Sequence, residues 1–199
     1  MATQTFPSIG IRDSSWEIVS NRRQFSSPFT EATQYAQRGG TRWRVTLNTV
    51  PLNKRNRATM QAFITRVTAR SEPFTLTPDA YTRLGAGGGA PKVNGASQTG
   101  FTLDIDGAPA SVTGWLVAGD YFEVDGQLKQ MTEDADTNGS GEATLVFAPE
   151  LRRAPSDNAE VTLNLPTGTF RLVDNVNGWS NRAPALSEFS LICVEDVLA

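Results

Sequence analysis

The chain of 199 residues contains no histidine. Histidine is the commonest general base and the commonest side-chain metal ligand, and it is the middle member of Ser-His-Asp and Cys-His pairs. Carboxylate or lysine chemistry remains open to the chain, but the most frequent catalytic arrangements are excluded. We therefore predict that the protein is not an enzyme and needs no cofactor.

Cysteine and long hydrophobic runs are also scarce. Cys193 is the single cysteine, so no disulfide can form within the chain and no thiolate metal cluster can be built. It stands in an apolar run, where a free cysteine is usually a small buried residue. No stretch approaches the roughly 18 to 20 apolar residues of a membrane helix. Since no secretory signal is visible either, we expect a product made in the cytoplasm that contacts no membrane.

The charged residues are unevenly distributed along the chain. The net charge is only −3, but residues 1–70 carry eleven Lys or Arg against three Asp or Glu, whereas residues 71–153 carry five basic and twelve acidic residues. Such segregation fits a nucleic-acid face, or a positive surface of one copy that meets a negative surface of the next. Few aromatic residues are interleaved with the basic ones, so we expect no specific nucleic-acid binding.

One helix is predicted at about 54–70. An apolar stripe repeats at helical spacing through Met60, Phe63, Ile64 and Val67, and Asn53 is suited to cap the first turn. The first turns also carry three basic residues, which the helix dipole disfavours by tenths of a kcal/mol each. Those three residues are Lys54, Arg55 and Arg57. They indicate an acidic partner or, alternatively, a solvated basic face.

The rest of the chain is predicted to be β. Trp43, Val45 and Leu47 alternate with polar residues, which is the period of a half-buried strand. After a glycine run at 85–89, interpreted as a flexible linker, short strands recur about every ten residues, as in a small all-β module. We expect these strands at 99–105, 112–116, 120–124, 128–132 and 144–147, with later ones at 169–173 and 186–194. The predicted organisation is a β body made from 1–80 and 154–199, with a β module inserted at 81–153.

The segment 22–38 is polar and rich in β-forming residues. Its Ser-Ser-Pro sequence at 26–28 predicts a turn, and the glycines at 39–40 predict a break in the chain. We interpret the segment as a hairpin that projects from the body. A hairpin so polar has little core of its own, so it needs a neighbour to hold it, and Arg22, Arg23 and Arg38 are its basic residues.

The sequence D-A-D-T-N-G at 134–139 matches the first half of a calcium-binding loop. Asp134, Asp136 and Asn138 are therefore weak candidates for a cation site. Leu145 occupies the position where the bidentate glutamate belongs, and no helix pattern flanks the loop. Because Asp, Asn and Gly also form good turns between strands, an ordinary turn is the preferred interpretation.

Carboxylates and tryptophans are two further kinds of candidate functional residue. Asp104 and Asp106 are expected on the same face of a strand, and a second group of carboxylates lies at 120–125. Paired carboxylates can hydrolyse glycosides when they are suitably spaced. However, no apolar pocket is predicted around these residues. We therefore expect these carboxylates to face solvent. Trp43 and Trp115 alternate with polar neighbours, so they are predicted to lie in the core instead of stacking on sugars or bases.

Several short motifs carry a resemblance to a known family. They are GWLVAGDYFEV at 114–124, QLKQ at 127–130, DADTNG at 134–139, GEATL at 141–145 and APELR at 148–152. Earlier matches are WRVTL at 43–47, the 60–67 helix segment, PFTL at 73–76 and QTG at 98–100. This pattern, which covers nearly the whole chain, resembles distal tail proteins of long-tailed, siphovirus-type bacteriophages.

The resemblance implies a mainly β fold: a tail-tube-like β-sandwich or split barrel with one α-helix, plus an inserted small all-β module. It implies a structural virion protein of the tail baseplate that forms a homohexameric ring and contacts the tail tube protein, the tape measure protein and the hub proteins. No catalytic residue carries over. The alternative is a carbohydrate-binding attachment module of a phage tail. Candidate inter-subunit residues are Arg22, Arg23, Arg38, Lys54, Arg55 and Arg57.

Overall fold

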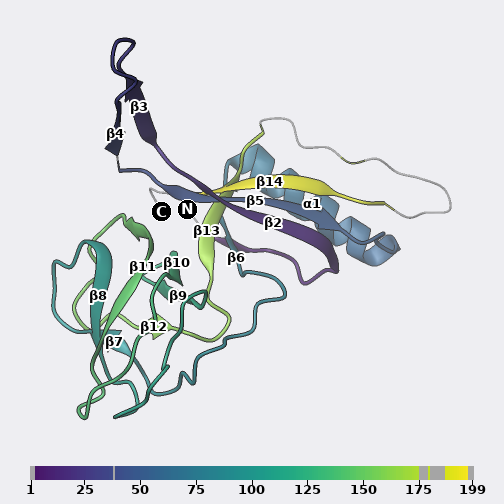
Figure 1. Cartoon of the computed structure of the whole chain (residues 1–199). Coiled ribbons are helices and arrows are strands. Elements are labelled where there is room, and N and C mark those ends of the chain that lie inside the picture. Colours follow the sequence, from purple (N-terminus) through teal and green to yellow (C-terminus); the bar gives the residue numbers. More distant parts are fainter. Residues whose placement is uncertain (1–2, 38, 175–178, 180–186, 197–199) are drawn as a thin grey trace.

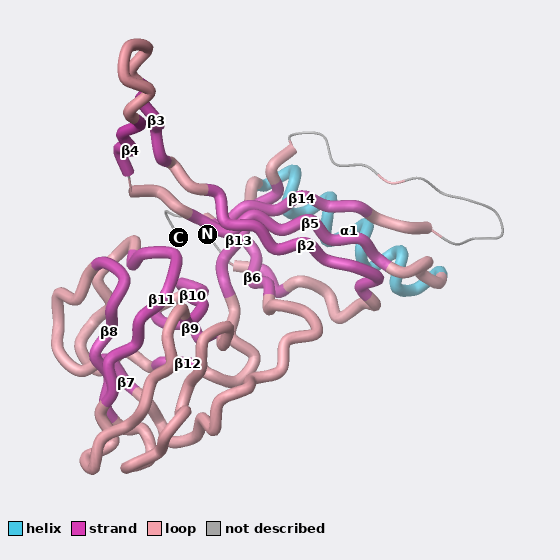
Figure 2. Tube along the Cα trace, viewed as in Figure 1, coloured by secondary structure: helices cyan, strands magenta, loops and turns pink. Residues whose placement is uncertain are grey.

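The computed structural model describes residues 3–37, 39–174, 179 and 187–196, and there the chain is mainly β with one helix (Figure 1). A sheet covered by the helix forms one part, a small barrel forms the second, and a two-stranded hairpin stands away from both. Figure 2 shows that long loops connect the barrel strands. The predicted fold class, a mainly β split barrel with one helix, is confirmed.

The first sheet combines strands from both ends of the chain. Its order is β1 (Gln4–Thr5), β6 (Phe74–Leu76), β13 (Gly168–Leu172), β14 (Ser190–Glu195), β5 (Arg42–Thr49) and β2 (Ile11–Val19). Only β1 and β6 pair in parallel. Along β5, buried and half-buried residues alternate, as the sequence predicted, so that Trp43, Val45 and Leu47 lie in the core.

The helix α1 (Lys54–Arg70) covers one face of this sheet. Met60, Phe63, Ile64 and Val67 are its buried residues, as predicted, and they share a hydrophobic cluster with the sheet. The Asn53 side chain caps the helix by accepting the backbone N–H of residue 56 at 3.0 Å. No helix in the described part of the chain is long and apolar enough to span a membrane.

The second sheet is an antiparallel, nearly closed barrel. Its order is β12 (Val161–Thr162), β9 (Tyr121–Val124), β10 (Gln127–Met131), β11 (Ala143–Leu151), β8 (Gly100–Asp106) and β7 (Lys92–Val93). A bridge between Lys92 and Glu160 brings its two edges together. The predicted end of the inserted module at residue 153 falls short of β12, which belongs to this sheet because its backbone pairs with β9.

One predicted strand, 112–116, is wrong. The segment is a turn region in which Gly114 adopts a φ of 63°, and only Leu116 forms an isolated bridge, to Ala135. The glycine run also differs from the expected flexible linker. Backbone N–H groups of Ala86 and Gly87 donate to carbonyls at 114 and 115 at 3.0 and 2.8 Å. The run is therefore fixed to the 114–115 turn region of the second part.

Cys193 lies in β14 and is fully buried, as predicted. Burial raises the pKa of its thiol to about 12. Because the thiolate is the reactive form, we expect the native protein to be inert toward a disulfide reagent at pH 8, and one thiol to react after unfolding in guanidinium. Absorbance of the released thiol dye measures both states. A rapid reaction of the native protein would contradict the buried position.

Candidate functional site

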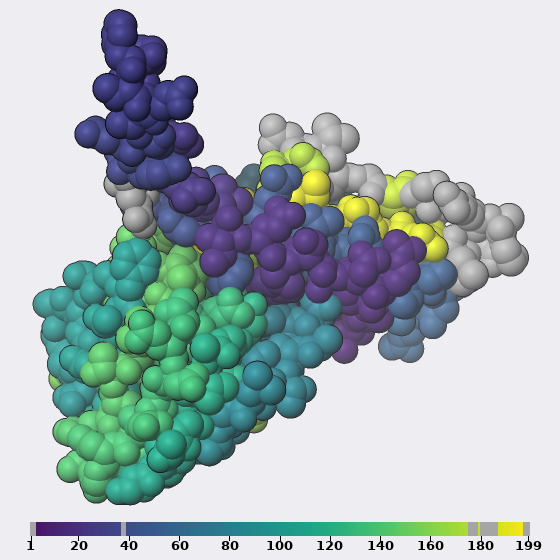
Figure 3. Space-filling model, in the orientation of Figure 1, coloured from purple at the N-terminus to yellow at the C-terminus, as the bar shows by residue number. Residues whose placement is uncertain are grey.

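The β3–β4 hairpin is a strongly exposed element. Strands β3 (Arg22–Ser26) and β4 (Thr33–Gln37) pair in an antiparallel register, and every residue of β3 is exposed. In Figure 3 the hairpin stands as a separate column above the rest of the molecule. This agrees with the predicted projecting hairpin at 22–38, of which residue 38 lies outside the described residues.

Three aromatic side chains are displayed on this hairpin. Phe25 is 57% exposed, Tyr35 is 61% exposed and Phe29 at the tip is 95% exposed. Alternation along the strands places Phe25 and Tyr35 on opposite faces of the ribbon. The Arg22 guanidinium lies over the Tyr35 ring, 5.5 Å from its centre. Both faces therefore present an aromatic group to a partner.

The root of the hairpin is held where the sheet meets the barrel. The Asn21 side-chain amide donates to the Gly39 carbonyl at 3.3 Å, which closes the neck of the hairpin. The backbone N–H of Gly40 donates to the Glu150 carboxylate of β11 at 3.2 Å. Only the root is anchored by these bonds, so the ribbon beyond it is free to contact another molecule.

A buried group of charged residues joins the two parts beneath this root. Lys129 is fully buried and donates to the Glu150 carbonyl at 2.8 Å, and burial lowers the pKa of its ammonium to about 8. Glu195 accepts the Trp43 N–H at 3.1 Å, and burial raises the pKa of its carboxyl. Arg152 lies 4.0 Å from Glu195. The Arg152–Glu195 pair and the attraction between Lys129 and Glu195 both cross the junction between the barrel and the sheet.

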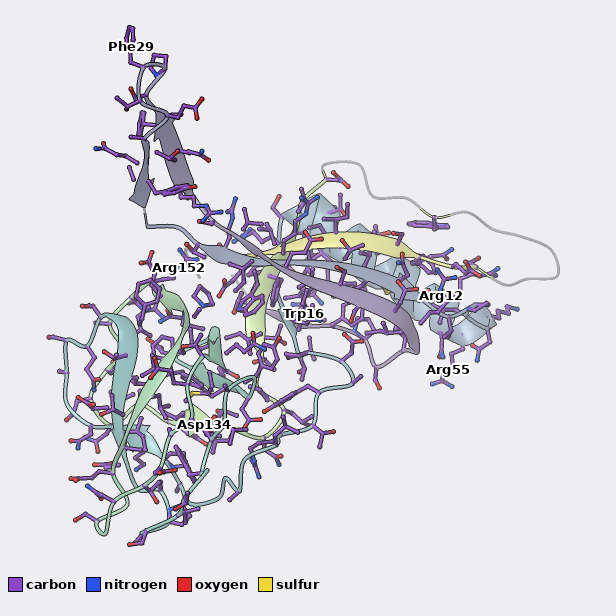
Figure 4. All side chains as sticks on the ribbon, in the orientation of Figure 1. Arg12, Trp16, Phe29, Arg55, Asp134 and Arg152 are labelled. Atoms are coloured by element: carbon purple, nitrogen blue, oxygen red, sulfur yellow. The ribbon has the colours of Figure 1, made fainter. Side chains whose placement is uncertain are left out.

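The basic residues predicted for an interface fall into two separate places. Arg22 and Arg23 lie on the hairpin, whereas Lys54, Arg55 and Arg57 lie in the first turns of α1, with no acidic residue in its first turn. Figure 4 shows Arg55 at one end of the sheet, far from the hairpin tip. The structure thus gives two basic surfaces instead of one.

The predicted cation candidates form a turn between β10 and β11. The Asp134 carboxylate accepts the N–H of residue 118 at 2.8 Å, and the Asp136 carboxylate accepts the N–H of Gly114 at 2.7 Å. The Asn138 side-chain oxygen accepts the N–H groups of residues 140 and 142. No group of three or more metal-ligating side chains occurs within the described residues. These side chains serve the turn by capping backbone amides.

Asp120 contradicts the expectation that the strand carboxylates face solvent. It is fully buried, and its carboxylate accepts the backbone N–H groups of Leu84 and Gly85 at 2.8 and 2.9 Å and that of Val117 at 3.1 Å. The Tyr81 hydroxyl donates to it at 3.2 Å. Its role is structural, because it ties the glycine-rich segment to the barrel. The sequence motif Gly119-Asp120 gives no sign of this distant loop.

The tryptophans Trp43 and Trp115 lie in the core, as predicted. The Trp43 indole N–H donates to the Leu128 carbonyl at 3.1 Å, and the Trp115 indole N–H donates to the Gly88 carbonyl at 3.2 Å. Trp16 packs edge to face on Trp43, with ring centres 6.0 Å apart. These rings support the sheet and the barrel and are not available to stack on a ligand.

A groove that the sequence did not indicate runs along the barrel where β7 and β12 meet. Its volume is about 580 Å³, and its lining comes from Arg83, the 88–92 segment and the 160–164 segment. None of these lining residues is aromatic, so the groove offers no platform for a sugar ring. No local motif could have located it, because the two segments are far apart in the sequence.

No family model matches the sequence, and no curated protein is similar to it at a significant level.

Proposed function

We propose that the protein is a structural component of a phage virion, forming a ring at the distal end of the tail. In this role it connects the tail tube to the baseplate hub, and the ring is a homohexamer. The sequence motifs that resemble distal tail proteins support this function. The mainly β split barrel with one helix is the fold that the resemblance implies.

The projecting hairpin is the observation that carries the proposal. A two-stranded hairpin is at best marginally stable in water on its own, and this one exposes three aromatic rings. A neighbouring subunit that covers those rings would stabilise the hairpin and gain binding energy from them, because buried aromatic residues dominate interfaces. A hairpin at one end of each subunit is suited to the head-to-tail contacts of a ring.

The use of the carboxylates also favours a structural role over an enzyme. Asp120, Asp134 and Asp136 accept backbone N–H groups, and the Asp104 carboxylate accepts the Thr144 hydroxyl at 2.6 Å. Carboxylates that act as acid and base need a cleft in which substrate lies between them. These side chains are instead committed to turns and strands.

The direct test is the mass of the purified protein in solution. Light scattering at low and high salt, with negative-stain images of the same sample, is expected to show closed rings that loosen as salt rises. A monomer at all concentrations and both salt levels would overturn self-assembly in the absence of other tail proteins. Binding to a glycan array without ring formation would favour the attachment-module alternative.

The helix start provides a second test of assembly by complementary charge. We expect Arg55→Glu with Arg57→Glu to abolish ring formation, because the change replaces two positive charges at a surface that would meet acidic residues of a neighbour. The helix dipole favours acidic residues in the first turn, so the variant should fold at least as well as the wild type. Light scattering gives the assembly state and circular dichroism the folding. Rings of normal size would count against the charge model.

A further inference from the structure

The hairpin tip is an ordered turn that displays one aromatic residue. Backbone N–H groups of Ser27 and Glu31 donate to the carbonyls of Ala32 and Ser27, each at 3.0 Å, and close the loop around Phe29. Glu31 adopts a φ of 54°, which an L-residue takes up only when its surroundings require it. It is the single acidic residue of 22–38. The tip therefore combines an apolar knob with one negative charge.

The groove beside β7 and β12 is also partly apolar but carries charge of the opposite sign. Pro91, Val161 and Leu163 give it an apolar floor, and Arg83 and Lys92 give it two positive charges. Glu160 is the acidic residue of its lining. The lining therefore provides both an apolar surface and an excess of positive charge.

The position of Arg83 is fixed by the glycine-rich segment. Its Nε donates to the Gly85 carbonyl at 3.3 Å, and its guanidinium lies against Gly87. A Cβ at residue 87 would come within 2.3 Å of that guanidinium, and Gly87 has a φ of 59°. Glycine is thus needed there for the arginine to hold its place at the groove.

Two exposed leucines directly follow residues that line the groove. Leu84 follows the lining residue Arg83 and is 76% exposed, while Leu165 follows the lining segment 160–164 and is 73% exposed. Leu165 also has a φ of 50°, a left-handed conformation that is unfavourable for a leucine. Exposed leucines on both segments, one held in a strained conformation, are what a partner surface would cover.

We propose that this groove receives the hairpin tip of a second copy of the chain. Phe29 would lie against Leu84 and Leu165, and Glu31 would face Arg83 and Lys92. Figures 1 and 4 place the tip and the β7–β12 region at opposite ends of the molecule, so one chain cannot make the contact with itself. When each copy makes this contact with the next, the interface is head-to-tail, and it generates a closed ring if the rotation between copies closes. The inference rests on the proposed ring function and specifies one of its contacts, separate from the charge contact proposed at the start of α1.

The cysteine content of the chain permits a direct cross-linking test. Cys193 is buried, so single cysteines introduced beside the contact, at Thr30→Cys and Asn164→Cys, would be the reactive thiols and would leave Phe29 and Leu165 in place. The two variants are mixed under the conditions in which the wild type assembles and treated with a short bis-maleimide. We expect a cross-linked dimer from this pair. As a matched control, Thr30→Cys is mixed with Phe101→Cys and should give little product, because Phe101 is 42% exposed on β8 outside the groove.

Charge reversal supplies a second readout. Glu31→Lys should weaken association about tenfold, and combining it with Arg83→Glu and Lys92→Glu should restore it, because the attraction is re-established with the signs exchanged. Rings in the wild-type sample without selective cross-linking between positions 30 and 164 would overturn this contact and leave the ring function standing. A wild type that stays monomeric by light scattering at every concentration and both salt levels would overturn this contact and, with it, self-assembly of the purified protein.

Discussion

Replacing residues 22–37 by a short Gly-Ser turn is expected to give a folded monomer that forms no rings. The hairpin contributes no residue to either hydrophobic cluster, and its neck is already closed by the bond from Asn21 to Gly39. Removal should therefore change the free energy of unfolding by less than about 1 kcal/mol. The loss of three exposed aromatic anchors should eliminate assembly. Light scattering measures assembly, and urea unfolding measures stability.

Phe101→Ser is the matched control, because it removes an exposed aromatic ring from the barrel and leaves the hairpin intact. This variant should assemble as the wild type does. If the hairpin-less protein still formed rings of normal size, the hairpin would not be the assembly element, and the observation that carries the proposed function would be lost. If it failed to fold, the hairpin would have a structural role that its exposure does not indicate.

Local features were predictable from the sequence because short-range physics determines them. The helix at 54–70 follows from one apolar stripe and one capping residue, and both lie within the segment itself. The strand around Val45 follows from alternation with period two. The hairpin was predictable for the same reason: its turn residues and polarity are local, and its strands are adjacent in sequence.

Features that depend on distant segments were not predictable. The burial of Asp120 arises because residues 84–85 return to its carboxylate, which no pattern near residue 120 reveals. The same return bonds the glycine run, expected to be a flexible linker, to the backbone of residues 114 and 115. The barrel also recruits β12 from beyond the expected boundary, since its closure needs a strand beside β9 and β7. Each of these three features results from contacts between segments that are far apart in the sequence.

The candidate site likewise combines features that the sequence predicts locally with features that only the fold brings together. The composition correctly separated a basic segment from an acidic one, but a sequence gives net charge per segment and not position on a surface. In the structure the basic residues divide between the hairpin and the start of α1. The groove that complements the hairpin tip is formed by residues near 88 and near 162, and only the folded barrel brings them together.

Asp120→Ala is expected to destabilise the protein by about 3 to 5 kcal/mol, the largest effect of any single substitution proposed for this chain. The fully buried carboxylate accepts three backbone N–H groups, from Leu84, Gly85 and Val117, and alanine would leave all three without an acceptor. Each buried donor left unsatisfied costs about 1 to 3 kcal/mol, although local rearrangement recovers part of that. Urea unfolding followed by tryptophan fluorescence measures the loss.

The network of hydrogen bonds at this site extends beyond the Asp120 carboxylate. A single substitution there should therefore affect both the barrel and the sheet. The Tyr121 N–H donates to the Tyr81 hydroxyl at 3.0 Å, and that hydroxyl donates to Asp120. Burial raises the pKa of Tyr81 to about 12, so the hydroxyl stays a donor throughout the physiological range. Tyr121 in turn packs on Trp43 of the first sheet. Losing the carboxylate therefore loosens the barrel and its junction with the sheet together.

Glu133→Ala removes the same negative charge from an exposed position in the next turn and should change stability by less than about 0.5 kcal/mol. Asp120→Asn retains one acceptor oxygen but places amide hydrogens against backbone donors. The stability that it loses should therefore lie between the losses for the two alanine variants. A loss for Asp120→Ala no larger than that for Glu133→Ala would mean that packing around Trp115 and the glycine run, and not the carboxylate, holds residues 84–85 in place. Because those residues also lead into the groove proposed to receive the hairpin tip, a destabilised variant should lose assembly as well, while its hairpin remains intact.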